Sequence, residues 1–151
     1  MVMRSYWAIA CLVAMTQLGE ITSMSAGETA LAAYRWENRV LLVFAPDVDS
    51  THYLRQQEML LNAESGLNER DVVVISVLKD VVSTKERPAA PVSADDLRDA
   101  YDVLPHDFLV VLIGKDGGVK LRHDEPILAA DLFALIDSMP MRKQEMRRPP
   151  G

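Results

Sequence analysis

The sequence predicts a single α/β domain in which a central four-stranded mixed sheet carries helices on both faces. Residues 40–45 and 71–78 are apolar without alternation, which is typical of strands covered on both sides. An amphipathic segment separates them, so these three elements are predicted to form a right-handed βαβ unit with parallel strands. Residues 115–118, Lys-Asp-Gly-Gly, indicate a turn between two further, antiparallel strands.

Composition limits the number of domains and the classes of partner. The chain has 151 residues, of which 49% are hydrophobic and 25% charged, as expected for one globular domain. Its formal charge of −6 argues against nucleic-acid binding, which depends on an excess of Lys and Arg. The last ten residues are basic, and they either contact an acidic surface or form a solvated, frayed tail. We favour the tail, disordered over 147–151. The basic residues among the last ten are Arg142, Lys143, Arg147 and Arg148.

The N-terminal residues resemble a signal peptide. Arg4 precedes an apolar run at 7–15, and polar and small residues follow it. The run is shorter than the ~20 apolar residues of a spanning helix, so we expect no permanent membrane span. Residues 1–25 are predicted to be removed near Ser25 or Ala26, which leaves a periplasmic or secreted protein.

Cysteine usage restricts the chemistry of the exported chain. Cys11 is the only cysteine, and it lies within the predicted signal peptide. Its removal leaves no thiol, no disulfide and no thiolate metal ligand. We therefore predict neither a bound cofactor nor a metal.

The predicted domain spans 26–146. Its first half is predicted to contain two helices. A short helix occupies 28–38, and a longer one begins at Asp49 or Ser50 and runs to about Glu64, with Gly66 as its stop signal. The stripe of the longer helix that faces the sheet is predicted to comprise Tyr53, Leu54, Gln57, Leu60 and Leu61.

The second half begins with a predicted long loop over 79–92. Ser93 then opens a helix as part of a capping box, and Leu97 and Tyr101 face inward. The antiparallel strands are placed at 108–113 and 119–122.

The last predicted helix starts at Pro126 and is closed by Met139-Pro140. Its apolar face comprises Leu128, Leu132, Leu135 and Ile136.

This order of elements, β-α-β-α-β-β-α, resembles a thioredoxin-like domain. The resemblance implies that the strands lie side by side in the order 119–122, 108–113, 40–45, 71–78. It also places the functional turn of the fold directly after residue 45.

Several motifs are similar to a bacterial family known only as a domain of unknown function. The similarity covers residues 36–146. The same domain occurs in secreted vertebrate sushi-repeat proteins, where it is called peroxiredoxin-like, or P-DUDES. The resemblance implies an extracytoplasmic setting and no established activity. The motifs are Trp36 and Arg39, then Glu69-Arg70-Asp71, Gly114 to Lys120, and Ile136 to Arg142 with Glu145 and Met146.

The sequence departs from redox-active relatives at the turn that carries their chemistry. Residues 47–52 contain no cysteine at the start of the helix, where the dipole would activate a thiolate. Pro105 falls too early to match the cis-proline of thioredoxins, and no arginine stands just ahead of Phe108. Thiol redox catalysis is therefore excluded for a chain that has lost Cys11.

The candidate binding surface comprises Asp47, Asp49, Thr51, His52, His106 and Asp107. The turn carboxylates and His52 are few ligands for a metal, and helix capping explains them better. His106 beside Asp107 is a possible base, with Thr51 as the one conceivable nucleophile, but loop polarity is the simpler explanation. His123-Asp124-Glu125 is interpreted as a solvated strand end.

Three functional hypotheses follow. The first is an exported thioredoxin-fold binding module for an unknown protein or small molecule. The second is a peroxiredoxin-like or other oxidative-stress enzyme that uses non-thiol chemistry. The third is Cu(I) handling by Met139, Met141 and Met146, although core packing is the favoured role of these residues.

Overall fold

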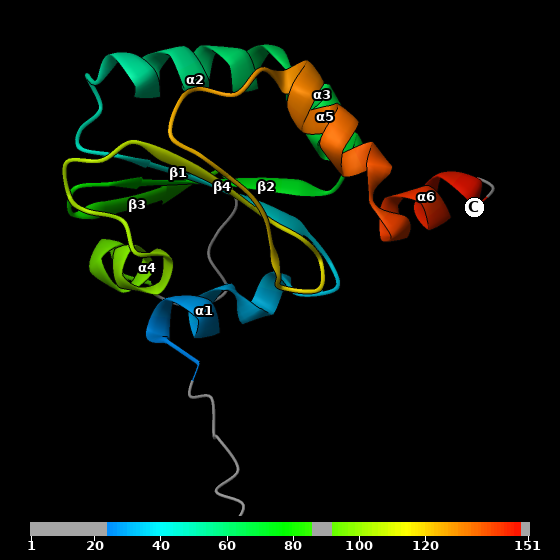
Figure 1. Ribbon diagram of the computed structural model, residues 1–151, viewed down its shortest axis with the longest axis horizontal. Coiled ribbons are helices and arrows are strands. Elements are labelled where there is room, and N and C mark those ends of the chain that lie inside the picture. The colour runs from blue at the N-terminus through cyan, green and yellow to red at the C-terminus, as the bar shows by residue number, and fades with distance from the viewer. Residues whose placement is uncertain (1–23, 86–91, 149–151) are drawn as a thin grey trace, which may run out of the picture.

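Five strands form one mixed sheet in the computed structural model, which describes residues 24–85 and 92–148 (Figure 1). The sheet order is β3-β2-β1-β4-β5; β1 and β2 are parallel and the other neighbours antiparallel. The predicted signal peptide before Met24 lies outside the described residues. The strands are β1 (Arg39–Ala45), β2 (Val72–Leu78), β3 (Val81–Thr84), β4 (Leu109–Ile113) and β5 (Val119–His123).

The four predicted strands are present in the predicted order, but the predicted strand count is wrong. The chain turns at Lys79 and Asp80, and β3 pairs with β2 from Leu78↔Val81 to Ile75↔Thr84. The segment 79–92 was predicted to be a loop. The residues of β3 are exposed or only partly buried, so the strand forms because β2 offers a free edge rather than because of its own apolar pattern.

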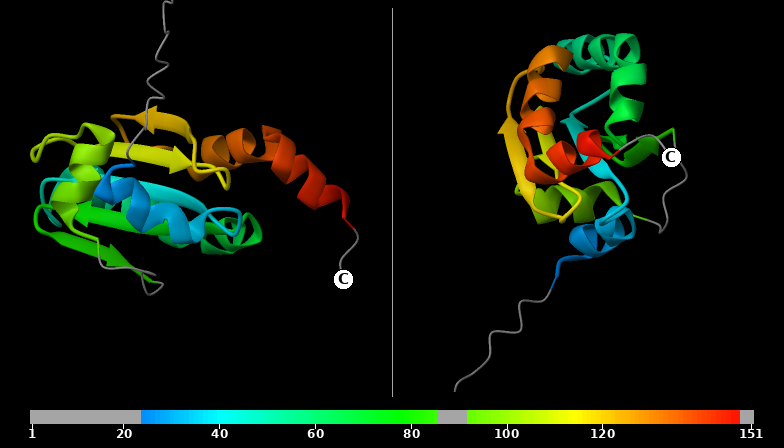
Figure 2. Two further views of the ribbon diagram at one scale, coloured as in Figure 1. Left: turned by 90° about the horizontal axis from the view of Figure 1, so that it is seen from below. Right: turned by 90° about the vertical axis from the view of Figure 1, so that its right-hand side faces the viewer.

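Helices cover both faces of the sheet, as predicted (Figure 1). α1 and α4 lie against one face, and α2, α3 and α5 against the other, while α6 extends beyond the end of the sheet (Figure 2). The helices are α1 (Ala26–Leu31), followed by a 3-10 turn (Ala32–Tyr34), α2 (Thr51–Asn62), α3 (Glu64–Glu69), α4 (Ala94–Tyr101), α5 (Ala129–Ser138) and α6 (Pro140–Arg147).

β1 divides the core into two parts because its side chains alternate between the faces. Val40, Leu42 and Phe44 pack toward α1 and α4, and Leu41 and Val43 pack toward α2 and α5. Every residue of β1 is buried. Burial on both faces explains the apolar run without alternation.

Two predicted helix starts are confirmed by their caps. The Ser50 hydroxyl accepts a hydrogen bond from the Tyr53 N–H, and the Ser93 hydroxyl accepts one from the Asp96 N–H. Leu97 is buried on α4, as predicted.

The predicted buried stripe of α2 wrongly includes Leu54 and Leu61 and omits Gln56. Leu54 and Leu61 are 54% and 59% exposed, whereas Gln56 is fully buried and Gln57 partly buried. The Gln56 amide pairs with the backbone of Ile127: it donates at 3.2 Å and accepts from the Ile127 N–H at 2.7 Å. The buried face therefore contains an amide because a loop backbone needs both hydrogen bonds there.

The sequence predicted that Gly66 ends the long helix, and this prediction is wrong. Gly66 lies inside α3. A Cβ at this position would meet Phe133 Cε2 on α5 at 2.5 Å. The chain instead breaks at Ala63, with φ −111° and ψ 10°. Gly66 is thus a packing residue that lets α5 approach α3.

The C-terminal segment also differs from the prediction. α5 begins at Ala129, three residues after Pro126, and Leu128 is 53% exposed. The helix α5 ends at Ser138 with Met139 as its C-cap, as predicted, but Pro140 then begins a further helix, α6, that was not predicted. Arg142, expected in a frayed tail, is 6% exposed.

Replacing Gly66 by alanine tests the packing role. A glycine-to-alanine change inside a helix ordinarily stabilises a protein by about 0.5–1 kcal/mol. Here we expect Gly66→Ala to lower the free energy of unfolding by about 1–3 kcal/mol, because the methyl group must displace the Phe133 ring. Urea unfolding measures the change. Ser65→Ala, at the exposed neighbour, is the control and should be neutral; a stabilised Gly66→Ala variant would contradict the packing role.

Candidate functional site

The turn after β1 is the first part of the predicted binding surface. Asp47 Oδ1 accepts a hydrogen bond from the Asp49 N–H at 3.0 Å, which closes the turn locally. Asp47, Asp49 and Thr51 are exposed, and Ser50 rather than Asp49 caps α2. These three residues flank the start of α2, and none of them lines the hollow beside it.

A hollow of about 430 Å³ lies beside the first turn of α2. It forms at the end of the sheet where β1 stops and β4 begins, because Phe44 pairs with Leu109. Three predicted residues line it, and three residues that were not assigned to the site join them. The polar lining comprises His52, Asp102, His106, Asp107, Arg122 and Asp124.

The side chains of the hollow are open to solvent and loosely paired. The His52 ring lies 5.3 Å from the Phe108 ring between centroids. His106 Nε2 is 3.5 Å from Asp107 Oδ1, and these side chains are 77% and 45% exposed. Such an exposed pair contributes little to stability. The groups are therefore available to a ligand.

The chemistry of the hollow is polar and net negative. Three carboxylates and one guanidinium line it, which disfavours an anionic ligand. Within residues 24–85 and 92–148, no three His, Cys, Asp or Glu side chains come close enough together to hold a metal ion.

Antiparallel pairing could have identified Arg122 and Asp124 from the sequence. Because β5 runs back along β4, its last residues return to the end where β4 begins, and Val110 pairs with His123. The strand end at 123–125, interpreted as merely solvated, therefore contributes Asp124 to the hollow.

Arg98 supports the loop that forms one wall of the hollow. It is 3% exposed and donates hydrogen bonds to the carbonyls of Ala45 at 2.8 Å, Leu104 at 3.0 Å and Val77 at 3.4 Å. Desolvation lowers the pKa of Arg98, against the opposing effects of Asp95 and Asp107. Arg98 thus ties the ends of β1 and β2 to the loop that carries His106.

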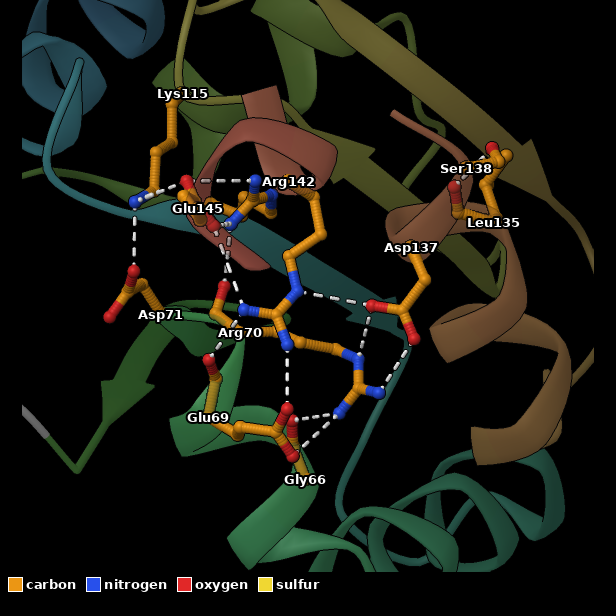
Figure 3. Close-up of polar contacts among 11 residues, drawn as sticks. Gly66, Glu69, Arg70, Asp71, Lys115, Leu135, Asp137, Ser138, Arg142 and Glu145 are labelled. Carbon is orange, nitrogen blue, oxygen red and sulfur yellow. Dashed lines mark hydrogen bonds and ion pairs between the residues drawn. The ribbon is translucent and has the colours of Figure 1, made fainter. Parts of the chain in front are cut away.

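A second group of charged residues, the charged cluster, lies at the opposite end of the sheet, where α5 and α6 meet the start of β2 (Figure 3). It comprises Arg39, Glu69, Arg70, Asp71, Lys115, Asp137, Arg142 and Glu145. All eight fall within the motifs that resemble the domain of unknown function.

One half of the charged cluster centres on Asp137. Arg70 binds its carboxylate in a bidentate manner, with Nη2 at 2.7 Å and Nε at 3.0 Å. Arg142 Nε donates to the same carboxylate at 3.1 Å, and Arg142 Nη2 lies 2.6 Å from Glu69 Oε1. The guanidinium of Arg70 also lies over the Phe133 ring, 4.3 Å from the centroid.

The other half centres on Glu145. Its Oε1 lies 2.9 Å from Lys115 Nζ and 3.2 Å from Arg39 Nη2. Lys115 Nζ also lies 2.8 Å from Asp71 Oδ2. Because Arg39 begins β1, this half ties the central strand to α6.

The three methionines proposed as copper ligands differ in their surroundings. Met139 packs against the apolar core, and Met141 is partly buried. Met146 is 50% exposed. Met139 thus has a packing role.

The fold defines the class of the protein as a thioredoxin-like domain. Its structure is similar to a 2-Cys peroxiredoxin from Plasmodium vivax, with a TM-score of 0.56 and 19% identity over 76% of this chain and 84% of that one. Prx1a from Plasmodium yoelii gives 0.55 and 18% over 80% and 83%. At these identities the similarity concerns the fold.

The chain belongs to the DUF4174 family, a domain of unknown function whose model matches residues 30–145. Human sushi repeat-containing protein SRPX is 32% identical over 114 residues, which are 73% of this chain and 25% of that protein. Coiled-coil domain-containing protein 80 of Danio rerio is 29% identical over 136 residues, 79% of this chain and 16% of that protein. The chain thus spans a quarter or less of the length of these relatives.

The helices of residues 24–85 and 92–148 are all too short or too polar to cross a bilayer.

The pH dependence of stability tests the Asp137 half of the charged cluster. Hydrogen bonds from Arg70, and then Arg142, hold the pKa of Asp137 below its ordinary value despite burial. A carboxylate with a lowered folded-state pKa stabilises the protein above its unfolded-state pKa, near 4, and loses this contribution as the pH falls through the folded-state value.

Asp137→Asn should therefore cost about 1–2 kcal/mol at pH 7, and the difference from the unchanged protein should shrink below about pH 4. Urea unfolding from pH 7 to pH 2 measures it. Asp99→Asn, at an exposed position on α4, is the matched control. A difference that stays constant with pH would rule out the ion pairs as its cause.

Proposed function

We propose that this chain is an exported binding module, in which the hollow beside α2 recognises a polar group of a protein or small molecule outside the cytoplasm. The observation that carries the proposal is the convergence of His52, His106 and Asp107 from two separate segments on one open hollow. Its volume, about 430 Å³, is within the range of ligand sites.

The sequence supports export. The charged and apolar pattern over residues 1–25 is that of a signal peptide, and similarity to sushi repeat-containing proteins agrees with an extracytoplasmic setting. N-terminal sequencing of the natural product tests the cleavage near Ser25 or Ala26. An intact N-terminus would contradict it.

The residues at the turn support binding rather than thiol catalysis. Cys11 is the only cysteine, so residues 12–151 have no sulfur nucleophile at the start of α2. The hollow remains as the recessed polar surface at the same end of the sheet.

The three histidines provide an internal test of the binding surface. His52 and His106 line the hollow, whereas His123 does not and instead contacts the backbone of Glu125 through Nδ1 at 2.7 Å. Adding an extracellular or periplasmic fraction that contains the partner should shift the imidazole NMR signals of His52 and His106 and leave that of His123 in place.

Variants extend this test. His52→Ala combined with His106→Ala should reduce partner retention on a column at least tenfold, and His123→Ala should not change it. Equal retention of the partner by the unchanged protein, the double variant and the His123→Ala variant would exclude the hollow as the binding surface.

A peroxidase assay tests the enzymatic alternative. The chain without residues 1–25 should consume hydrogen peroxide no faster than buffer, in the presence of either dithiothreitol or a thioredoxin system, because it carries no thiolate. A mature peroxiredoxin is the positive control. Turnover that is lost when His106 and Asp107 are replaced would favour non-thiol catalysis over binding.

A further inference from the structure

α6 is attached to the domain mainly by charge. Of its eight residues only Arg142 is buried, and Met146 is 50% exposed. By contrast, α5 buries Leu132 and Ile136. A helix this short is not stable alone, and most helices in proteins are held by an apolar face. The position of α6 therefore depends on the ion pairs of Arg142 and Glu145.

Glu145 lies between two cations that belong to other elements. Arg39 is 1% and Lys115 9% exposed. Both Glu145 oxygens are used: Oε1 contacts both cations, and Oε2 lies 3.3 Å from Arg39 Nη1. Two hydrogen bonds from Arg39 make this a bidentate carboxylate contact.

The two cations are held in place without α6. Arg39 Nη1 donates to the Arg70 carbonyl at 2.8 Å, and Lys115 Nζ donates to Asp71 Oδ2 at 2.8 Å. Arg39 and Lys115 thus form a preformed cationic site, in which Nε of the buried Arg39 guanidinium has no acceptor among the described residues.

Electrostatics favours exchange of one carboxylate for another over simple opening. Removing one partner of a buried ion pair is strongly unfavourable, because a charge is left uncompensated. If an incoming carboxylate replaces Glu145, that cost is avoided. The ion pairs of Arg142 with Glu69 and Asp137 must still be broken for α6 to leave.

We propose that Arg39 and Lys115 form a carboxylate-binding site, which Glu145 occupies as an internal ligand and from which an acidic peptide segment of a partner displaces it. The site lies at the opposite end of the sheet from the hollow and is independent of the proposed function. α6 is then a cover that leaves when a partner carboxylate enters.

Glu145→Gln in the full chain removes the internal ligand while keeping its shape. We expect a fluorescent Gly-Glu-Gly-Glu-Gly peptide to bind this variant at least about tenfold more tightly than the unchanged protein. In the unchanged protein Glu145 competes with the peptide at a high effective concentration, and the variant lacks this competitor. Adding Lys115→Met to the variant should abolish the gain. Glu58→Gln, at an exposed position on α2, is the matched control and should behave like the unchanged protein.

A second measurement does not depend on a variant. Saturating peptide should speed hydrogen exchange of the α6 amides in the unchanged protein and leave the amides of α5 protected. Acetate at the same carboxylate concentration distinguishes a free ion from a peptide; equal effects would overturn the assignment to a protein segment. No gain in affinity for a folded Glu145→Gln variant, together with unchanged exchange of α6, would overturn the site itself.

Discussion

The burial of β1 on both faces is the constraint on which the rest of the structure depends. All seven residues of this strand are buried, and the first of them, Arg39, is a cation. An unpaired charge in such a position is costly, so its guanidinium needs acceptors nearby. The Arg70 carbonyl and Glu145 supply them. The central strand thereby determines where α3 ends and where α6 lies.

The polar side chains at the two ends of the sheet differ in how they are paired and how far they are exposed. At the start of β1, eight charged residues pair with one another, and several of them are nearly buried (Figure 3). At its end, the polar side chains lie in an open hollow and are free to meet solvent. Buried Arg98 stabilises that end by donating hydrogen bonds to backbone carbonyls rather than to a carboxylate. The charged residues at the start of β1 thus pair with one another, whereas the polar side chains at its end stay accessible to solvent.

The similarity to peroxiredoxins concerns this frame and not its chemistry. A fold can host unrelated functions, which depend on the side chains placed on it. Ser50 caps α2 here, and residues 47–52 provide no thiol. The frame still brings the start of α2, the start of β4 and the end of β5 to one place. In this chain the convergence produces the hollow, and its polar character comes from the side chains that line it.

Part of the candidate site could be predicted from the sequence. The helix cap at Ser50 depends on a hydrogen bond three residues away, so it could be predicted from adjacent residues. His52, His106 and Asp107 could be grouped because the fold places their segments together. Arg122 and Arg98 were missed. The first needs the antiparallel register of β5, and the second lies on the buried face of α4.

The sequence by itself determined the order of the four predicted strands, the parallel pair β1 and β2 and the absence of cysteine after residue 11, because apolar patterns, caps and composition are local properties. Only the tertiary structure decided that β3 adds to an open edge, that Gly66 admits Phe133 and that Gln56 is buried against Ile127. It also decided that a basic segment becomes α6. Each of these depends on a partner distant in sequence, whose position is set only when the whole domain has packed.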